Sequence, residues 1–329
     1  MKIKIKDTIG RLYPLLVCSL LAGACSKSPQ GEDESQGERS AIILTAGVKD
    51  SALPVRTNAA IPAGASASVW VYKRSQPNVP AAVSAVSPSV AGKKYTAAAS
   101  GKLTPVDGEN IYLEKGDYDI YSLGLFSGGA LTAAEGTVSA GKSGQLANAR
   151  DYIFVENPAV NVPAVPATKD ISLTYTHAAA RIVLELSRDD ASVEQFTLSS
   201  VKMTPPVESA SCVLDFAAGK IVPAASTAAE AASVEMDQVA AGSKYSYVML
   251  PLASGQKITF LITGRVTPKG QAARDMVLKA SYAASAVLEG GNSYVLKAKI
   301  AATGVVFEPG LKVEDWDYSP GDIEVVPVP

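Results

Sequence analysis

The chain has 329 residues and a formal net charge of −2, and chains of this length ordinarily fold as more than one domain. Because Lys and Arg are not in excess, nothing gathers phosphates, and nucleic acid is excluded as a partner. The single histidine, His177, excludes a metal site of several histidines and would have to serve any Ser-His or Cys-His pair. No constellation of residues indicates catalysis, so we expect no enzyme, no metal and no cofactor.

Residues 1–24 have the form of a secretory signal, with four basic residues before an apolar run at 12–24. A helix of that run would reach about 20 Å, which is too short to span a bilayer. Small residues precede Cys25, and the segment Leu21-Ala-Gly-Ala-Cys25 resembles a bacterial lipobox, although Ala22 stands where Leu is commoner. The resemblance implies that a lipid (palmitate) on Cys25 anchors the chain in the outer membrane. The alternative is an ordinary signal with an unmodified cysteine.

The next segment, residues 25–40, is predicted to be a flexible tether. Between Cys25 and Arg39 it carries no apolar side chain, so it cannot bury enough surface to offset the entropy lost on ordering. Its acidic cluster, Glu32–Glu34, resembles the signal that sends some lipoproteins to the outer face of the outer membrane. We therefore expect export through the periplasm to the cell surface.

From residue 41 onward, apolar and polar residues alternate with a period of two, and Gly, Pro and Asp interrupt the runs. This pattern is typical of short β-strands, and no helix-length crossovers lie between them, which favours sandwiches over an α/β fold. The best helix candidate, residues 227–233, is short and can equally be a loop. The clearest predicted strands are 42–48, 68–73, 110–113, 118–123, 151–155, 171–175, 181–186, 196–203, 212–216, 245–251, 257–264, 275–282 and 294–300.

Three prolines within residues 156–168 predict a connector between two domains, because proline removes ladder donors and stiffens the chain. We therefore predict an N-terminal β-sandwich over 41–167 and a C-terminal β-sandwich over 168–329. Cys212 lies in an alternating run and is interpreted as a small buried apolar residue rather than a nucleophile. His177 is interpreted as structural.

The two tryptophans bear on a second class of function, a surface lipoprotein that binds glycans. Sugar sites generally need exposed aromatic platforms beside carboxylates or amides. Trp70 lies within an alternating strand and is predicted to be core. Trp316, between two aspartates, is either an exposed platform or a plug for a groove.

The order of these features resembles that of the fimbrillin family, the pilins of type V fimbriae. After the lipobox and acidic tether come a lone strand, a basic residue and the Trp/Tyr strand at 68–72. The block at 113–123, Leu-Glu-Lys-Gly-Asp-Tyr-Asp-Ile-Tyr-Ser-Leu, follows. The block at 173–184 contains His177-Ala-Ala-Ala-Arg181, the most specific part, and Trp316 completes the series.

The resemblance implies two tandem sandwiches of the transthyretin-like type and an assembly mechanism. In these pilins a trypsin-like protease cuts after an arginine, and the first strand then leaves its groove. The strand that corresponds here is 41–48, with Ile42, Leu44 and Val48 on one face. Arg56 and Thr57 are the residues expected to flank the cut.

Arg39 is the rival cleavage site, but it precedes the strand, so cutting there would remove only the tether. In the family, a strand from the C-terminal segment of the next subunit fills the emptied groove. The corresponding segment here is 305–329, with Ile323 and Val325 as candidate inserting residues. The alternative is that this segment forms the last strands of the second sandwich, and the ending Pro327-Val-Pro329 would blunt strand pairing.

From the resemblance we expect a structural subunit of surface fimbriae that supports adhesion. Its partners would be other fimbrial subunits, the processing protease and, through Cys25, the outer membrane. The residues leave open whether it is a shaft, anchor or tip subunit.

Overall fold

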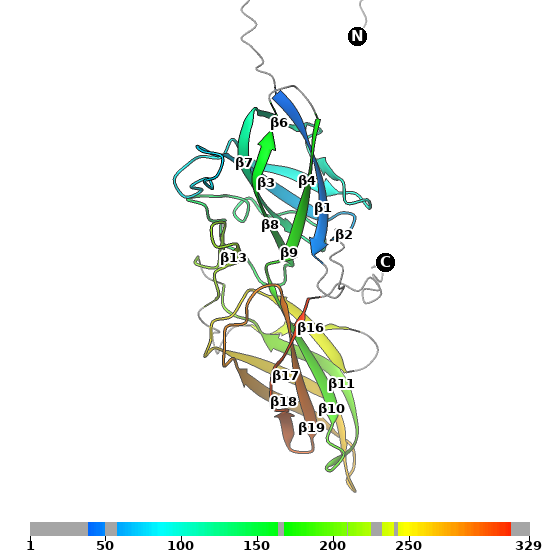
Figure 1. Cartoon of the computed structure of the whole chain (residues 1–329). Coiled ribbons are helices and arrows are strands. Elements are labelled where there is room, and N and C mark those ends of the chain that lie inside the picture. The colour runs from blue at the N-terminus through cyan, green and yellow to red at the C-terminus, as the bar shows by residue number, and fades with distance from the viewer. Residues whose placement is uncertain are drawn as a thin grey trace, which may run out of the picture. The chain divides into compact units, whose positions relative to one another are not determined.

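The computed structural model describes residues 39–49, 58–163, 168–208, 210–224, 232–239 and 243–316. Within these ranges the chain forms 21 strands and no helix, which confirms the predicted all-β class (Figure 1). No helix in this part of the chain is long and apolar enough to cross a membrane. Several predicted features lie outside it, namely Cys25, Arg56, Thr57, Ile323, Val325 and most of the helix candidate at 227–233.

The first half of the chain forms a nine-stranded sheet with the order β2-β1-β9-β8-β7-β3-β4-β5, in which β6 also pairs with β1. A bridge between Thr45 of β1 and Lys102, the residue before β5, joins the two ends of this order. The sheet therefore curls around a single core. Its strands are β1 (Arg39–Lys49), β2 (Asn58–Ala60), β3 (Ser66–Lys73), β4 (Val90–Ala97), β5 (Leu103–Pro105), β6 (Ile111–Glu114), β7 (Gly116–Leu125), β8 (Tyr152–Val162) and β9 (Thr168–His177).

The core inside this sheet is built from alternate residues of nearly all its strands, as period-two patterning requires. Tyr175 of β9 lies fully within it, and its hydroxyl forms a 2.7 Å hydrogen bond with the hydroxyl of Ser122 on β7. Burial raises the pKa of Tyr175 because the charged form would lose its solvation. The pair thus satisfies polar groups that an apolar core would otherwise leave unpaired.

The second half forms a six-stranded sheet, β15-β16-β10-β19-β20 with β21 also on β19, and a four-stranded sheet, β14-β11-β17-β18. Residues of both sheets contribute to one core, as in a β-sandwich. A separate hairpin is formed by β12 and β13. The strands are β10 (Ala180–Arg188), β11 (Val193–Thr204), β12 (Leu214–Asp215), β13 (Lys220–Ile221), β14 (Val234–Glu235), β15 (Asp237–Gln238), β16 (Lys244–Met249), β17 (Lys257–Pro268), β18 (Arg274–Ala283), β19 (Asn292–Ala301), β20 (Gly304–Phe307) and β21 (Lys312–Asp315).

The stretch expected to connect two domains is largely strand. β8 continues through Val162, and β9, placed by the sequence in the second domain, pairs with β1 and β8 of the first sheet. The first sheet therefore ends at His177 rather than at residue 167. Pro158 is accommodated because the pairing of β7 with β8 shifts register there, at a bulge where Ala159 has a φ of 61°.

An aromatic cluster lies on the outer face of the first sheet. Trp70 of β3 and Tyr121 of β7 both contact Phe216, the residue after β12 in the β12–β13 hairpin. The ring centroids are 5.3 Å apart in each pair. Trp70 is therefore core, as predicted, and Cys212 is fully buried in the same cluster. The hairpin of the second half thus covers an apolar face of the first sheet.

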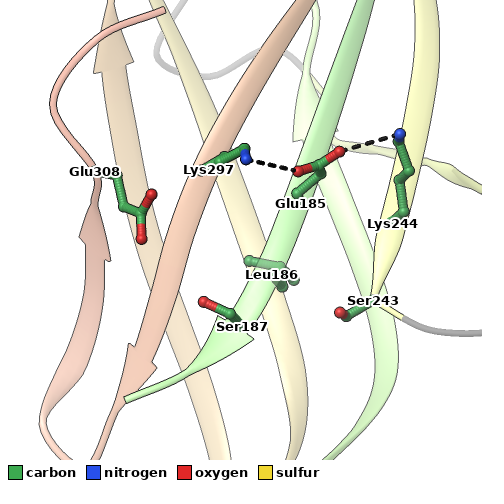
Figure 2. A pocket seen from close by; sticks show the side chains of 7 residues that line it. All are labelled: Glu185, Leu186, Ser187, Ser243, Lys244, Lys297 and Glu308. Carbon is green, nitrogen blue, oxygen red and sulfur yellow. Dashed lines mark ion pairs between the residues drawn. The ribbon is translucent and has the colours of Figure 1, made fainter. Parts of the chain in front are cut away.

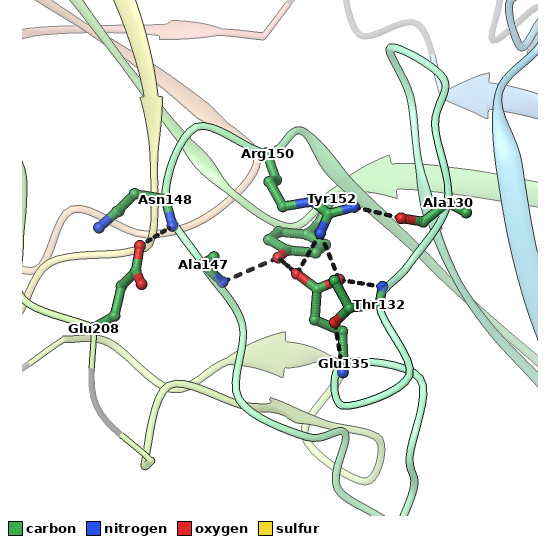
Figure 3. A network of polar contacts seen from close by, with 8 residues as sticks. All are labelled: Ala130, Thr132, Glu135, Ala147, Asn148, Arg150, Tyr152 and Glu208. Atoms are coloured by element: carbon green, nitrogen blue, oxygen red, sulfur yellow. Dashed lines mark hydrogen bonds and ion pairs between the residues drawn. The ribbon is translucent and has the colours of Figure 1, made fainter. Parts of the chain in front are cut away.

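A buried carboxylate organises the loop that joins β7 to β8 (Figure 3). Glu135 accepts hydrogen bonds from Nη1 of Arg150, from the hydroxyl of Tyr152 at 2.5 Å and from the backbone N–H of Thr132. The same loop reaches residue Glu208, whose Oε1 accepts the backbone N–H of Asn148 at 2.7 Å. A buried charge is tolerated here because every bonding direction has a donor.

Candidate functional site

The site that β1 occupies, between β9 on one edge and β6 and β2 on the other, is called here the seat of β1. It is the feature of the first sheet that bears most directly on function. Along one edge β1 pairs in parallel with β9 over eight residue pairs, from Ala41 opposite Thr168 to Val48 opposite Tyr175. Along its other edge it pairs with β6 near its start and with β2 near its end. β1 is therefore an interior strand whose two edges are both engaged.

One face of β1 is buried in the core of the first sheet. The side chains of Ile42, Leu44, Ala46 and Val48 are each at most 7% exposed and belong to that core. The predicted face of β1 is thus the face that the structure buries. Burying a Val, Leu or Ile side chain contributes about 1.5–3 kcal/mol, so this strand holds a large share of the core's stability.

The middle of the second edge depends on a glycine. The backbone N–H of Ala46 donates to the carbonyl of Gly101 at 2.8 Å. Gly101 has a φ of +77°, and a Cβ there would lie 2.5 Å from the carbonyl oxygen of Ala46. A side chain at position 101 would therefore push β1 out of its seat.

The residues expected to be cut, Arg56 and Thr57, fall between β1 and β2 and lie outside the described residues. Because β2 begins at Asn58, a cut after Arg56 would separate β1 from β2. The rival, Arg39, is the first residue of β1 and lies 3.7 Å from Glu114 of β6 in an exposed ion pair. A cut after Arg39 would leave β1 attached to the rest of the chain.

Part of the segment expected to form a C-terminal arm belongs to the second sandwich. β20 and β21 both pair with β19 of the six-stranded sheet, so residues 304–307 and 312–315 are its last described strands. For these residues the alternative of a sheet strand is correct. Ile323 and Val325 lie beyond Trp316, the last described residue.

Trp316 is not an exposed platform. Its side chain is 8% exposed and its ring stacks on the imidazole of His177, while the guanidinium carbon of Arg181 lies 5.3 Å from the ring centroid. His177 is itself buried, with Nδ1 2.7 Å from Oδ1 of Asp151, and its Nε2 has no hydrogen-bond partner among the described residues. A sugar could not stack on this tryptophan without displacing the histidine.

Two shallow depressions lie on the described surface. One, of about 400 Å³, lies over β10, β16 and β19, where Glu185 is 3.0 Å from Nζ of Lys244 and 3.7 Å from Nζ of Lys297 (Figure 2). Its lining holds no aromatic residue. Another, of about 410 Å³, includes Phe196 and Tyr245. No cluster of three or more metal-ligating side chains exists among the described residues.

The sequence did not predict which elements pair with β1 along the edge opposite β9. The alternation in β6 was recognised, but its pairing with β1 was not, and nothing marked Gly101 among the many glycines. The missing signal is long-range, because strand partners far apart in the sequence leave no local pattern.

The sequence profile of the fimbrillin-like family matches residues 55–316, which is more than half of the chain. The chain belongs to the fimbrillin-like family. This family consists of structural subunits, so the chain has the role of a fimbrial subunit at the cell surface. A comparison with curated proteins found no significant match.

Two solved structures share the fold. A candidate cell adhesion protein from Bacteroides uniformis has 16% sequence identity and a TM-score of 0.56, and the match covers 84% of this chain and 98% of that one. A second candidate cell adhesion protein, from Bacteroides ovatus, has 13% identity and a TM-score of 0.54, with 85% and 99% covered. At these identities the likeness concerns the fold alone.

Proposed function

We propose that this fimbrial subunit is assembled by donor-strand exchange at the seat of β1. A trypsin-like protease cuts after Arg56, β1 leaves, and a strand of another subunit takes its place. The chain reaches the cell surface as a lipoprotein carrying its lipid on Cys25, with residues 25–38, the part of the predicted tether that precedes β1, as the link. Its two tandem sandwiches are of the transthyretin-like type, and the finished fimbria supports adhesion.

The observation that carries this proposal is the position of β1, an interior strand that is also the first strand of the described chain. Its four core-facing side chains are buried and both of its edges are paired. Only residues 50–57 link it to β2. One cut in this link would make β1 a separate peptide held by noncovalent contacts alone.

The physical chemistry of the emptied seat favours refilling. Loss of β1 exposes the apolar core of the first sheet and leaves unpaired backbone groups on β9 and at Gly101. Such an edge accepts any strand that supplies matching side chains and backbone groups, which is strand addition. A strand supplied by another subunit would therefore join the two subunits through a continuous sheet.

The extent of the family match supports the same reading. The profile begins at residue 55, after β1 and just before Arg56. Nearly all of the matched region, from Thr57 to residue 316, would remain after a cut at Arg56. The segment beyond Trp316, with Ile323 and Val325, is the candidate strand that this subunit would offer to another subunit.

Limited trypsin digestion followed by N-terminal sequencing and intact mass tests the processing step. We expect one early cut with Thr57 as the new N-terminus, and an Arg56→Ala variant that is not cut there. Arg39→Ala is the matched control and should be processed normally. An early cut elsewhere in the described sandwiches, with residues 50–57 intact, would refute the proposed processing.

A second experiment tests the anchor. In the producing cells, a Cys25→Ser variant should lose palmitate label and should move from the membrane fraction to the soluble fraction. Cys212→Ser is the control, because Cys212 is fully buried and should keep the label unchanged. Equal label in the Cys25→Ser variant would refute lipidation at Cys25.

A further inference from the structure

We propose that the seat of β1 is filled by a strand from a different protein and not by residues 317–329 of a second copy of this chain. The partner is a fimbrial subunit that offers a proline-free strand with aliphatic side chains at every second position. This inference rests on the proposed strand exchange. It concerns which strand enters and not whether one enters.

The first step is the direction of the backbone groups in the seat. In an extended strand, side chains and N–H groups both alternate, so all residues that face the core point their N–H groups toward the same edge. Ala46 faces the core, and its N–H donates to Gly101 on the edge opposite β9. At the core-facing positions of β1, the backbone N–H groups therefore point to the edge formed by β6, Gly101 and β2. At the positions between them, the N–H groups point to β9.

The second step is the demand that this places on any replacement. Both edges of the seat are strand partners, so a replacement needs N–H groups at its core-facing positions and also at the positions between them. β1 meets this demand because residues 39–49 contain no proline. Its core-facing positions from 42 to 48 carry Ile, Leu, Ala and Val.

If the odd-numbered residues of 317–329 face the core, the prolines leave this segment without the N–H groups that the seat requires. If Ile323 and Val325 face the core, Pro327 and Pro329 occupy the next two core-facing positions. Neither proline has an N–H, so carbonyl groups at the edge of the seat, such as that of the buried Gly101, would lose their donor. Only two aliphatic side chains would remain to replace the four of β1.

The other alternation fails because of a charge. If Val326 and Val328 face the core, Glu324 occupies the core-facing position before them. An ionised carboxylate at any core-facing position from 42 to 48 would lose its hydration without a partner. A register that moves Glu324 to the place of the buried Ser40 leaves only Val326 and Val328 to replace the four aliphatic side chains of β1. The prolines would then face the other edge, again without donors. Reversing the strand direction exchanges the two edges of the seat and leaves both faults in place.

Peptide exchange on the trypsin-cut protein tests this assignment. Three fluorescent peptides are compared by anisotropy: residues 39–49, residues 317–329, and residues 317–329 with Pro327→Val and Pro329→Val. The first should bind, and the second should bind at least about 30-fold more weakly because it leaves two or more backbone groups unpaired. The third should recover binding, because it carries aliphatic residues at positions 323, 325, 327 and 329.

A matched peptide with Pro320→Val controls for proline content, since Pro320 precedes the alternating stretch, and it should bind no better than residues 317–329. If residues 317–329 bind as tightly as residues 39–49, the assignment to a different protein is overturned. It is also overturned if the cut protein alone forms linear multimers that vanish when residues 317–329 are deleted. If the peptide of residues 39–49 does not bind, strand exchange itself fails, and the inference fails with it.

Discussion

The indole of Trp316 stacks on the imidazole of His177, with ring centroids 4.4 Å apart and planes 4° from parallel. This contact joins the residue after β21 to the last residue of β9, so it ties the end of the second sandwich to the first sheet. Trp316, the last described residue, is therefore held against the first sheet.

Trp316→Ala should lower the free energy of unfolding by about 3 kcal/mol, because it removes a buried ring and leaves a cavity against His177. Urea denaturation followed by circular dichroism measures the change. Val313→Ala is the control, since Val313 is 55% exposed on β21 and should change stability by less than about 0.5 kcal/mol. Equal effects of the two substitutions would show that the stack carries no stability.

Leu44→Ala should destabilise the uncut protein by about 2–5 kcal/mol, because Leu44 is 1% exposed in the core of the first sheet. The effect should disappear when the protein is cut after Arg56 and β1 is replaced by a wild-type peptide of residues 39–49. Ile43→Ala, on the other face of β1, should have a smaller effect in the uncut protein. Persistence of the Leu44→Ala defect after peptide replacement would mean that the variant strand never left.

Asp119→Ala should be among the most damaging substitutions in the first sheet. The Asp119 carboxylate is buried, binds Nη2 of Arg74 at 2.7 Å and accepts the backbone N–H groups of Ala81 and Ala159. Its removal leaves the buried guanidinium of Arg74 without a carboxylate partner. The free energy of unfolding, measured with heat or urea, should fall by about 3–5 kcal/mol.

The exposed pair of Arg265 and Asp275, 3.2 Å apart, provides the comparison for Asp119. Asp275→Ala should change the free energy of unfolding by less than about 1 kcal/mol, because solvent screens an exposed pair. If Asp119→Ala were as mild as Asp275→Ala, the buried pair would not hold the loop that precedes β4.

Alkaline pH should unfold the protein through its tyrosines. Burial raises the pKa of Tyr121 and of Tyr247 to about 12 from an ordinary value of 10.0, and the pKa of Tyr72 is raised for the same reason. The tyrosines of the unfolded chain therefore ionise at a lower pH than the buried tyrosines of the folded protein. The contribution of the buried tyrosines to the free energy of unfolding is complete below pH 10.0 and is lost as the pH rises toward about 12. Absorbance at the phenolate band and circular dichroism should change together in that window. Ionisation of most of the 13 tyrosines at pH 10 without loss of structure would contradict this.

The strands themselves were predictable because alternation is local. In the runs that form β1, β3, β7 and β10, the alternation predicts which side chains face a core before any pairing partner is known. The alternation does not predict which strands pair with each other. The run at 171–175 reads as a strand in either domain, and only its pairing with β1 and β8 places β9 in the first sheet.

The candidate site was predictable in part for the same reason. The buried face of β1 follows from its alternation, whereas the contact of Ala46 with Gly101 joins residues that are far apart in sequence. The predicted strand at 212–216 is reduced to Leu214–Asp215, because the Asp215 carboxylate accepts the backbone N–H groups of Ala217 and Ala218 and starts a turn. Side chains that close turns in this way are difficult to distinguish from side chains that face solvent.

The most direct test of strand exchange locks β1 in its seat. Thr45 and Lys102 face each other across an antiparallel bridge, so the pair Thr45→Cys and Lys102→Cys should form a disulfide between β1 and the rest of the sheet. After cutting at Arg56, native mass spectrometry follows entry of an isotope-labelled peptide of residues 39–49. The account predicts no labelled peptide in the oxidised protein and full exchange once the disulfide is reduced. Labelled peptide bound equally before and after reduction, or in neither case, would contradict it.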